Sequence, residues 1–299
     1  MSLSTVSTVS LACLSMAAAL PAAPVEAPKP AALVTLRYQF QDGETVRYQI
    51  DQQATLMALK GEVREKTFSR SRTEQRLKVV SVDSEGVATL RLSIDEARME
   101  YAFNDVKPTV FDSRKKTLPK GVARAIDRPL AEIQVRPEGT VAAIEPLLSQ
   151  AELAEVPGKL GLDGEAASTL FVKLPDEPAA IGHEWHDIAA VKVSISRELT
   201  QEVKILKQYR LERVEDGIAV IDMKSSVMTP VTEPSMLVQL IQRTSTGTIR
   251  FDVAAGRIVD WKVDVDNTEI GWHGPDSSLR AVSTWNERLI GEPTSVSLR

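Results

Sequence analysis

The chain has 299 residues, of which 43% are hydrophobic and 26% are charged. Its 36 Lys and Arg against 41 Asp and Glu give a formal net charge of -5, which is too small and of the wrong sign to predict nucleic-acid binding through phosphate neutralisation. A chain of this length can bury a core that needs no disulfides, and the charges spread along it argue against a polytopic membrane protein.

Residues 1–27 predict a signal peptide. No charged side chain occurs before Glu26, residues 9–20 are apolar or small, and Ala23 and Ala27 offer cleavage sites. The start lacks the Lys or Arg usual in a signal peptide, so an uncleaved anchor remains an alternative. We therefore expect an exported protein, either periplasmic or extracellular.

The single cysteine, Cys13, lies within this segment. A lipoprotein signal would place Leu three residues before it, but Ser10 stands there, so we do not expect lipidation. Removal of the signal peptide would leave no thiol, which excludes thiolate catalysis and disulfides from the mature chain. The following residues, 28–35, are rich in Pro and Ala and predict an extended spacer.

Alternation of hydrophobic and polar residues predicts a first β-rich half over 36–145. Hydrophobic residues at 36, 38 and 40, and again from Val46 to Ile50, alternate with polar ones, as in half-buried strands. The segments 67–82 and 87–94 flank Asp83–Gly86. This arrangement predicts a β-hairpin.

A second β-rich half is predicted over 176–292, because turns of the first half recur there in the same order. The hairpin turn that ends at Gly86 recurs as one that ends at Gly217, and the turn that ends at Gly139 recurs as one that ends at Gly256. The third match pairs Gly43 with Gly182. These matches predict an internal duplication of roughly 110 residues. The alternative is that any all-β chain contains such turns.

The intervening residues, 146–175, predict a helical insert. Pro146 suits a first helical turn, and the hydrophobic residues after it build one apolar stripe. A second helix is expected to begin at Asp163 as N-cap and to end before Pro175. Two amphipathic helices need an apolar surface, and we expect them on the concave side of the flanking sheets.

Metal and catalytic motifs are weak. The segment 183–187 carries two histidines three residues apart, but on a strand these side chains point to opposite faces, which disfavours a metal site. The acids at 264, 266 and 269 lack the glycine of a calcium loop. Motifs of serine hydrolases, zinc proteases and phosphate loops are missing from the sequence. We therefore predict no catalytic residue, metal or cofactor, although 41 acids keep a two-carboxylate hydrolase open.

The candidate binding residues are Trp272, His273 and Asp276. They lie in a segment that its glycines and proline predict to be a loop, and loops often position ligand contacts; an ordinary turn is the alternative. A basic run could bind an anionic surface, but a solvated loop is the preferred interpretation. This run comprises Arg114, Lys115, Lys116, Lys120, Arg124 and Arg128. The four tryptophans, all in the second half, are expected in the core.

Three segments resemble a family of exported bacterial proteins of unknown function. They are Leu36–Glu44 (LRYQFQDGE), Pro178–Trp185 (PAAIGHEW) and Phe251–Ile258 (FDVAAGRI). The resemblance implies export and a β-rich fold, and it implies no activity. Curved sheets with helices against the concave face are also similar to the envelope lipoprotein carriers, an analogy of fold and not of function.

Together these patterns predict a mainly β fold. We expect two similar antiparallel halves that form a half-barrel or clam-like unit, with the helical insert between them. The leading hypothesis for function is a non-enzymatic exported protein of the cell envelope that binds a lipid or other hydrophobic ligand. The alternatives are a structural or adaptor protein that meets an envelope protein through exposed sheet edges, or a carboxylate-dependent hydrolase.

Overall fold

The computed structural model describes residues 33–104, 106–149, 152, 170–195, 198–291 and 294–295. The expected signal peptide, residues 28–32 of the spacer and most of the expected helical insert, including Asp163, lie outside these residues. Within the described part, strands dominate and both helices are short. The predicted mainly β fold is confirmed.

The described part of the first half contains six strands, β1 to β6. They are β1 (Glu44–Lys60), β2 (Val63–Val82), β3 (Ala88–Phe103), β4 (Thr109–Asp112), β5 (Pro129–Val135) and β6 (Val141–Pro146). The second half contributes β7 (Glu184–Ser194), β8 (Thr200–Glu215), β9 (Ile218–Val227), β10 (Thr246–Asp252), β11 (Arg257–Ile270) and β12 (Ser277–Leu289), followed by β13 (Thr294–Ser295). Two helices lie wholly within the described residues, α1 (Lys120–Ala125) and α4 (Pro234–Leu240).

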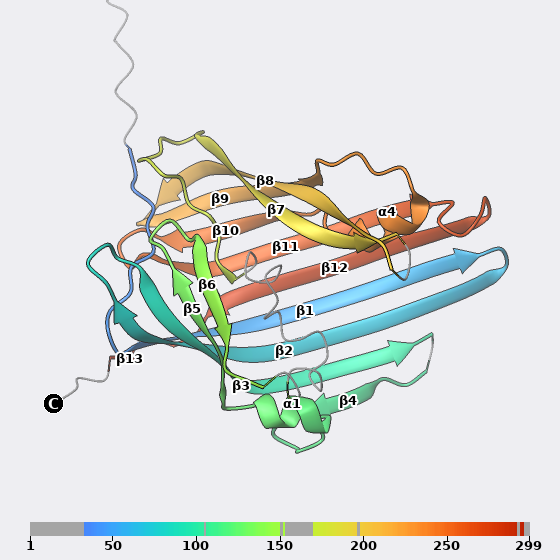
Figure 1. Ribbon diagram of the computed structural model, residues 1–299, viewed down its shortest axis with the longest axis horizontal. Helices are drawn as coiled ribbons and strands as arrows, with labels where there is room; N and C mark the ends of the chain where they lie inside the picture. Colours follow the sequence, from blue (N-terminus) through green and yellow to red (C-terminus); the bar gives the residue numbers. More distant parts are fainter. Residues whose placement is uncertain are drawn as a thin grey trace, which may run out of the picture. The chain divides into compact units, whose positions relative to one another are not determined.

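All of these strands belong to one open antiparallel sheet (Figure 1). Its order is β6-β5-β3-β2-β1-β12-β11-β10-β9-β8-β7, with β4 beside β3 and β13 beside β1. The two halves are therefore continuous, because β1 pairs with β12 from Tyr48–Leu289 to Lys60–Ser277. Within the described residues, β6 and β7 each pair on one side only, so the sheet is open.

The expected hairpins form where glycine supplies a left-handed backbone. Gly86 has φ +81°, and the Asp83 carboxylate accepts hydrogen bonds from the backbone N–H groups of Glu85 and Val87. In the second half, Asp216 and Gly217 have φ +51° and +79° and join β8 to β9 in a tight turn. Such positive φ values at both central residues match the twist of paired strands.

The order of elements is the same in both halves. The first half runs β1-β2-β3-α1-β5-β6, with the additional strand β4 before α1, and the second runs β7-β8-β9-α4-β10-β11. Strand β12 then returns to the middle of the sheet and pairs with β1. A common origin of the halves remains a prediction.

Two expected elements differ from the sequence-based prediction. The residues 36–40 form an extended segment outside the sheet, since the Tyr38 and Gln39 N–H groups donate to the turn carbonyls of Pro137 and Gly256. Their alternation still buries every second side chain. In addition, β6 continues through Pro146, which therefore does not begin a helix.

Helical structure is seen instead at Glu152. Its carboxylate accepts hydrogen bonds from the backbone N–H and the hydroxyl of Ser149, and its own N–H donates to the Ser149 hydroxyl oxygen. These reciprocal contacts form a capping box, an arrangement found at helix N-termini.

The core lies on one face of the sheet, here called the inner face. At one end, on the left in Figure 1, the segment 33–41 crosses the strand ends and closes this face. The Tyr38 ring meets the rings of Phe171 and Phe251 edge-on, with centroids 5.4 and 5.5 Å apart. We call this the packed end, because Leu36, Ile249 and Phe251 are all 0% exposed there.

Candidate ligand-binding hollow

The inner face changes character along the central strand β1. Val46 and Tyr48 are buried at the packed end, but Gln52, four residues further on the same face, is exposed. A central strand buries its inner face wherever a second layer covers it. The exposure of Gln52 therefore marks a place where no described residue covers the sheet completely.

One cavity opens beside Trp261 and has a volume of about 340 Å³. Its wall comes from β1, β7, β8, β9, β11 and β12 and from residues 242–245, and it combines hydrophobic side chains with polar ones such as Ser225, Gln242 and Ser245. The hydrophobic lining includes Ala189, Val191, Ile205, Trp261, Val263 and Val265. We call this space the Trp261 cavity; its size falls within the range of small-molecule pockets.

A second cavity, of about 320 Å³, lies between the Trp261 cavity and the packed end. We call it the Glu287 cavity. Its wall includes Tyr48, Phe171 and Glu287, together with a polar row on β1 and β2. Gln52 and Trp285 line both cavities, so the two spaces adjoin along the inner face, and we call the pair of cavities the hollow.

The aromatic wall between the cavities contains an unusual buried donor. Trp261 and Trp285 pack edge to face, with ring centroids 4.8 Å apart. The Trp261 indole Nε1 is buried and has no hydrogen-bond partner within the described residues. Most buried donors in folded proteins are satisfied, and the Trp272 Nε1 at the β11–β12 turn is a second exception.

Glu287 is a buried carboxyl group on the inner face of β12, between Ile50 of β1 and Trp261 of β11. Burial raises the pKa of Glu287 to about 8, since the ionised form is disfavoured away from water. The side chain is therefore mainly a neutral acid at pH 7. A nearby buried acid behaves differently, because Glu44 forms an ion pair with Arg257 at 2.8 Å.

Charged groups in the Trp261 cavity are Lys207 and Arg243. Lys207 lies directly opposite Asp187 in the register of β7 and β8. Burial lowers the pKa of Lys207, while the charge of Asp187 opposes this shift. The cation and the facing carboxylate thus offset each other at one side of the hollow.

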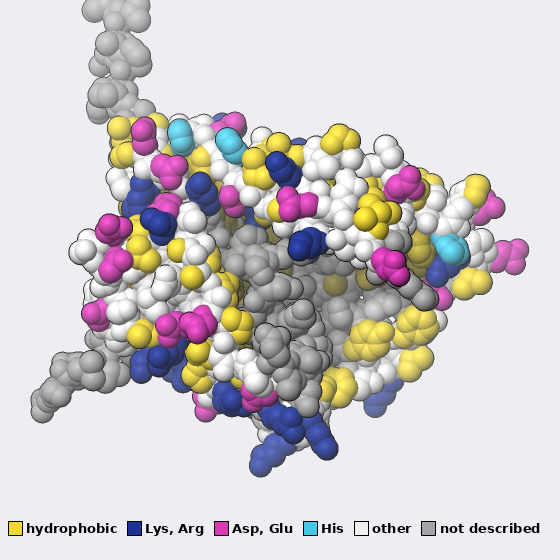
Figure 2. Space-filling model, viewed as in Figure 1, with side chains coloured by type: hydrophobic (Ala, Val, Ile, Leu, Met, Phe, Trp, Pro, Cys, Tyr) yellow, Lys and Arg dark blue, Asp and Glu magenta, His cyan; other side chains and the backbone are white. Residues whose placement is uncertain are grey.

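Beyond the cavities, apolar side chains remain exposed on the same face. Tyr101 and Phe103, at the end of β3, are 49% and 43% exposed. They lie opposite Ser69 and Thr67 of β2, and Figure 2 shows hydrophobic side chains gathered on the right of the molecule, where these strands end. Exposed hydrophobic side chains of this kind are often found at interaction sites.

The sequence-predicted binding residues lie at the tip of the β11–β12 hairpin. The His273 N–H donates to the Ser277 hydroxyl, and the Asp276 carbonyl accepts from the Gly61 N–H. The Lys60 ammonium stands 5.1 Å from the centroid of the Trp272 ring. The structure therefore brings Trp272, His273 and Asp276 together in one turn, but they line neither cavity. A ligand contact there remains a prediction.

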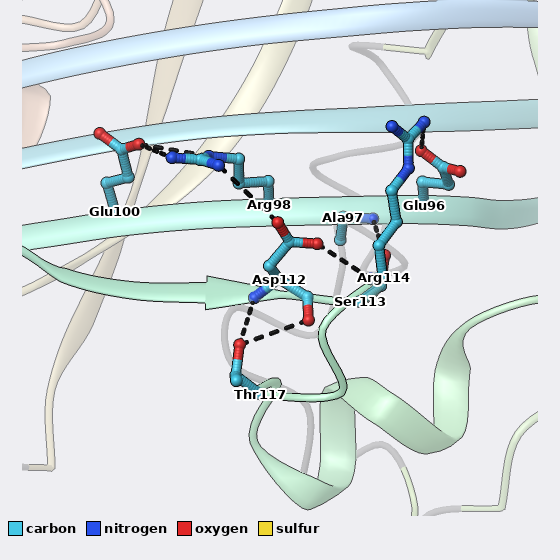
Figure 3. Close-up of polar contacts among 8 residues, drawn as sticks. All are labelled: Glu96, Ala97, Arg98, Glu100, Asp112, Ser113, Arg114 and Thr117. Atoms are coloured by element: carbon cyan, nitrogen blue, oxygen red, sulfur yellow. Dashed lines mark hydrogen bonds and ion pairs between the residues drawn. The ribbon is translucent and has the colours of Figure 1, made fainter.

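The basic run is only partly a loop, because its C-terminal part forms α1. Figure 3 shows that Arg114 pairs with Glu96, while Arg98 of β3 lies between Glu100 and Asp112. These ion pairs tie the turn after β4 to the neighbouring strand. Further along the run, Arg128 pairs with Glu152 at 2.9 Å.

The histidine-rich segment 183–187 begins β7 and packs through its aromatic rings. Trp185 stacks between His183 and Tyr209, with centroids 6.1 and 5.6 Å away, and its Nε1 donates to the Lys173 carbonyl. Among the described residues, no three His, Cys, Asp or Glu side chains group as metal ligands would. No helix in the described part is long and apolar enough to span a membrane.

A wider depression, of about 970 Å³, lies mainly over the outer faces of β8 to β11. Charges of both signs line it, among them Arg210, Asp222, Lys224 and Lys262. Asp222 lies opposite Arg210 in the sheet register. This surface suits solvent better than an apolar ligand.

Comparisons with known proteins give a likeness of fold. No family model matches the chain, and no curated protein matches its sequence. The fold is similar to that of lipovitellin in a solved structure described as lipid–protein interactions in lipovitellin, with a TM-score of 0.53 and 11% identity. The match covers 87% of this chain and 26% of lipovitellin, so the chain spans about a quarter of that protein's length.

The sequence analysis did not single out the residues of the hollow. Trp261 and Trp285 were expected to be core, and Trp285 is only half-buried. The sequence signal that could have indicated the hollow is Glu287. The alternation of side chains from Trp285 to Leu289 places this acid on the inner face of β12. An acid in such a position indicates a site that is not simply filled with hydrocarbon.

Proposed function

We propose that this chain is a non-enzymatic exported protein of the cell envelope that binds a lipid or other hydrophobic molecule. The hollow formed by the Trp261 and Glu287 cavities is the proposed binding site. The observation that carries this proposal is the pair of adjoining cavities, of about 340 and 320 Å³, on the inner face of the sheet. The likeness to lipovitellin supports it at the level of fold. Export rests on the pattern of residues 1–27.

The lining of the Trp261 cavity favours a hydrocarbon ligand. Val191 and Val265 are nearly inaccessible, and the half-buried Val263 leaves apolar surface facing the cavity. Burial of apolar ligand surface contributes about 25 cal/mol per Å². A chain of methylene groups would therefore gain affinity there without needing specific hydrogen bonds.

Binding is favoured over hydrolysis by the placement of acids. The described wall of the Trp261 cavity contains no carboxylate, and that of the Glu287 cavity contains only Glu287. Carboxylate-dependent hydrolases use two such groups across one site. The hollow therefore lacks the pair that this alternative requires.

The adaptor alternative has one observation in its favour. Strands β6 and β7 end the sheet order, and Ile188 on β7 is 47% exposed. Edge strands can pair with a partner chain. Recovery of a specific envelope protein with the wild-type chain, lost on Ile188→Lys, would favour this alternative over lipid binding.

Ligand extraction tests the proposed function. The full-length chain is purified after exposure to a total lipid extract, and bound molecules are identified by mass spectrometry. Ser283→Phe places an aromatic ring in the Trp261 cavity and so reduces its free volume. Thr284→Phe places the same ring on the exposed outer face of β12. We expect Ser283→Phe to reduce bound lipid about tenfold and Thr284→Phe to leave it unchanged.

A wild-type chain that carries no lipid would contradict the proposal, and so would equal retention by the two variants. Thermal unfolding of both variants shows whether they remain folded. The export part has a separate test, since N-terminal sequencing of the protein from the envelope fraction should begin at residue 24 or 28. An intact start in the cytosolic fraction would contradict export.

A further inference from the structure

The polar wall of the Glu287 cavity carries uncharged groups. Gln52 of β1 and Ser71, Thr73 and Gln75 of β2 line it, and all four lie on the inner face. Within the described residues, no hydrogen bond engages the side chains of Gln52, Thr73 or Gln75. The described wall contains no Lys, Arg or His. These groups can donate to and accept from a ligand without matching a charge.

Glu287 completes this wall as an acid held away from water. The titratable groups that face it are Tyr48 of β1 and Tyr38 of the crossing segment, and the Glu44–Arg257 pair lies beyond Tyr48. Tyr48 is already engaged, because its hydroxyl donates to the Ile258 carbonyl at 3.2 Å. In its neutral form, Glu287 offers one O–H donor and one carbonyl acceptor to the cavity.

The two cavities therefore differ in chemistry although they adjoin. Both cavities have hydrophobic residues in their walls. The polar groups of the Trp261 cavity include the cations Lys207 and Arg243, whereas those of the Glu287 cavity are amide, hydroxyl and carboxylic acid groups. An ionised ligand placed in the Glu287 cavity would lose its hydration without meeting an opposite charge, which is costly. A neutral polar group would exchange water hydrogen bonds for bonds to Gln52, Gln75 and Glu287.

We propose that the Glu287 cavity binds the uncharged, hydroxyl- or amide-bearing head of an amphiphile whose hydrocarbon chain lies in the Trp261 cavity. This inference rests on the proposed function and names its ligand class. The competing chemistry is an anionic head held by Lys207 and Arg243 at the other side of the hollow. The Asp187 carboxylate opposite Lys207 weakens that competitor.

Calorimetric titration of the full-length chain tests the inference with two ligands of equal chain length. Dodecanoic acid carries an anionic head at pH 7, and its glycerol monoester carries a neutral dihydroxyl head. We expect the monoester to bind about tenfold more tightly, which corresponds to one or two well-formed hydrogen bonds. Equal affinities, or tighter binding of the acid, would overturn the inference.

Two variants at one position separate the polar role of Glu287 from its packing. Glu287→Gln keeps a neutral donor and acceptor, so we expect the affinity for the monoester to stay within about threefold of wild type. Glu287→Leu keeps the volume and removes both groups, so we expect that affinity to fall about tenfold while the affinity for the acid stays unchanged. An unchanged monoester affinity in Glu287→Leu would overturn the inference.

Failure of the inference and failure of the proposed function give different results. If neither dodecanoic acid nor its monoester binds, or if Ser283→Phe does not weaken either, the hollow is not a lipid site. If both bind equally and Ser283→Phe weakens both, the hollow is a lipid site whose head-group preference was assigned wrongly. Only a preference for the monoester that depends on Glu287 supports both statements.

Discussion

The packed end and the hollow occupy the same face of the same strands, yet only one of them is filled. On β1, Val46 and Tyr48 are buried in the same hydrophobic cluster as Leu36 and Tyr38, while Gln52 is exposed. The alternation that turns side chains inward is the same in both regions. What differs is the second layer, so strand periodicity determines which face is inner but not whether that face is filled.

The comparison predicts unequal costs for removing large side chains. Phe251 is 0% exposed at the packed end, and Phe251→Ala should lower the free energy of unfolding by about 3–5 kcal/mol. Val263 lies in the wall of the Trp261 cavity, and Val263→Ala should cost about 1 kcal/mol or less, because the space beside it is already open. Urea denaturation measures both values. If the two substitutions lower the free energy of unfolding by similar amounts per carbon atom removed, the two regions are packed alike.

A second prediction concerns pH and the hollow. The pKa of Glu287 in the folded protein is raised to about 8, above its value in the unfolded chain, so the neutral acid persists only in the folded state as pH rises from about 4.5. The unfolded state then binds fewer protons, and wild-type stability should fall through this range up to about pH 8. Glu287→Gln removes this dependence and should be more stable at pH 7 by about 3 kcal/mol.

Urea denaturation of both proteins from pH 4 to pH 9 measures this difference. The two stability curves should lie closest below pH 4.5 and separate as pH rises. Parallel curves, or a wild type that gains stability relative to Glu287→Gln with rising pH, would show that Glu287 is not held neutral by burial.

A smaller contrast compares two glycines with similar backbone angles. At the packed end, Gly139 has φ +86°, and a Cβ there would lie 2.2 Å from the Val172 carbonyl oxygen. At Gly217, with φ +79°, no atom lies within 4 Å of such a Cβ. We expect Gly139→Ala to cost about 2–3 kcal/mol and Gly217→Ala about 1 kcal/mol, since only the first adds a clash to the left-handed strain. Thermal unfolding of the two variants measures both losses of stability. Equal losses would argue against close packing of residues 171–175 on the β5–β6 turn.

Local patterns predicted the hairpins well, and non-local contacts explain the differences. The turns at Gly86 and Gly217 could be located because the residues that favour a turn are adjacent in the sequence. The segment 36–40 shows the same alternation as a strand, but its N–H groups find partners more than ninety residues away, which no local pattern reveals. A non-local contact also explains Pro146, because its pairing with Ala131 of β5 makes it part of β6.

The candidate site was harder to predict than the fold. Trp272, His273 and Asp276 were chosen because they lie in a loop, and the structure places them together at a hairpin tip. The hollow instead depends on empty space between residues far apart in sequence, such as Gln52 and Trp285. Sequence periodicity could orient both side chains inward, but it could not indicate that nothing within the described residues covers them fully.

Quenching of tryptophan fluorescence tests the central claim most directly. In a chain with Trp185→Phe and Trp272→Phe, the remaining tryptophans, Trp261 and Trp285, both line the hollow. A glycerol monoester with a brominated acyl chain should quench their emission. Ser283→Phe should shift this quenching to about tenfold higher ester concentration, while Thr284→Phe leaves it unchanged. Emission that the brominated ester does not change, or a quenching curve that Ser283→Phe does not shift, would contradict a lipid-binding hollow on the inner face.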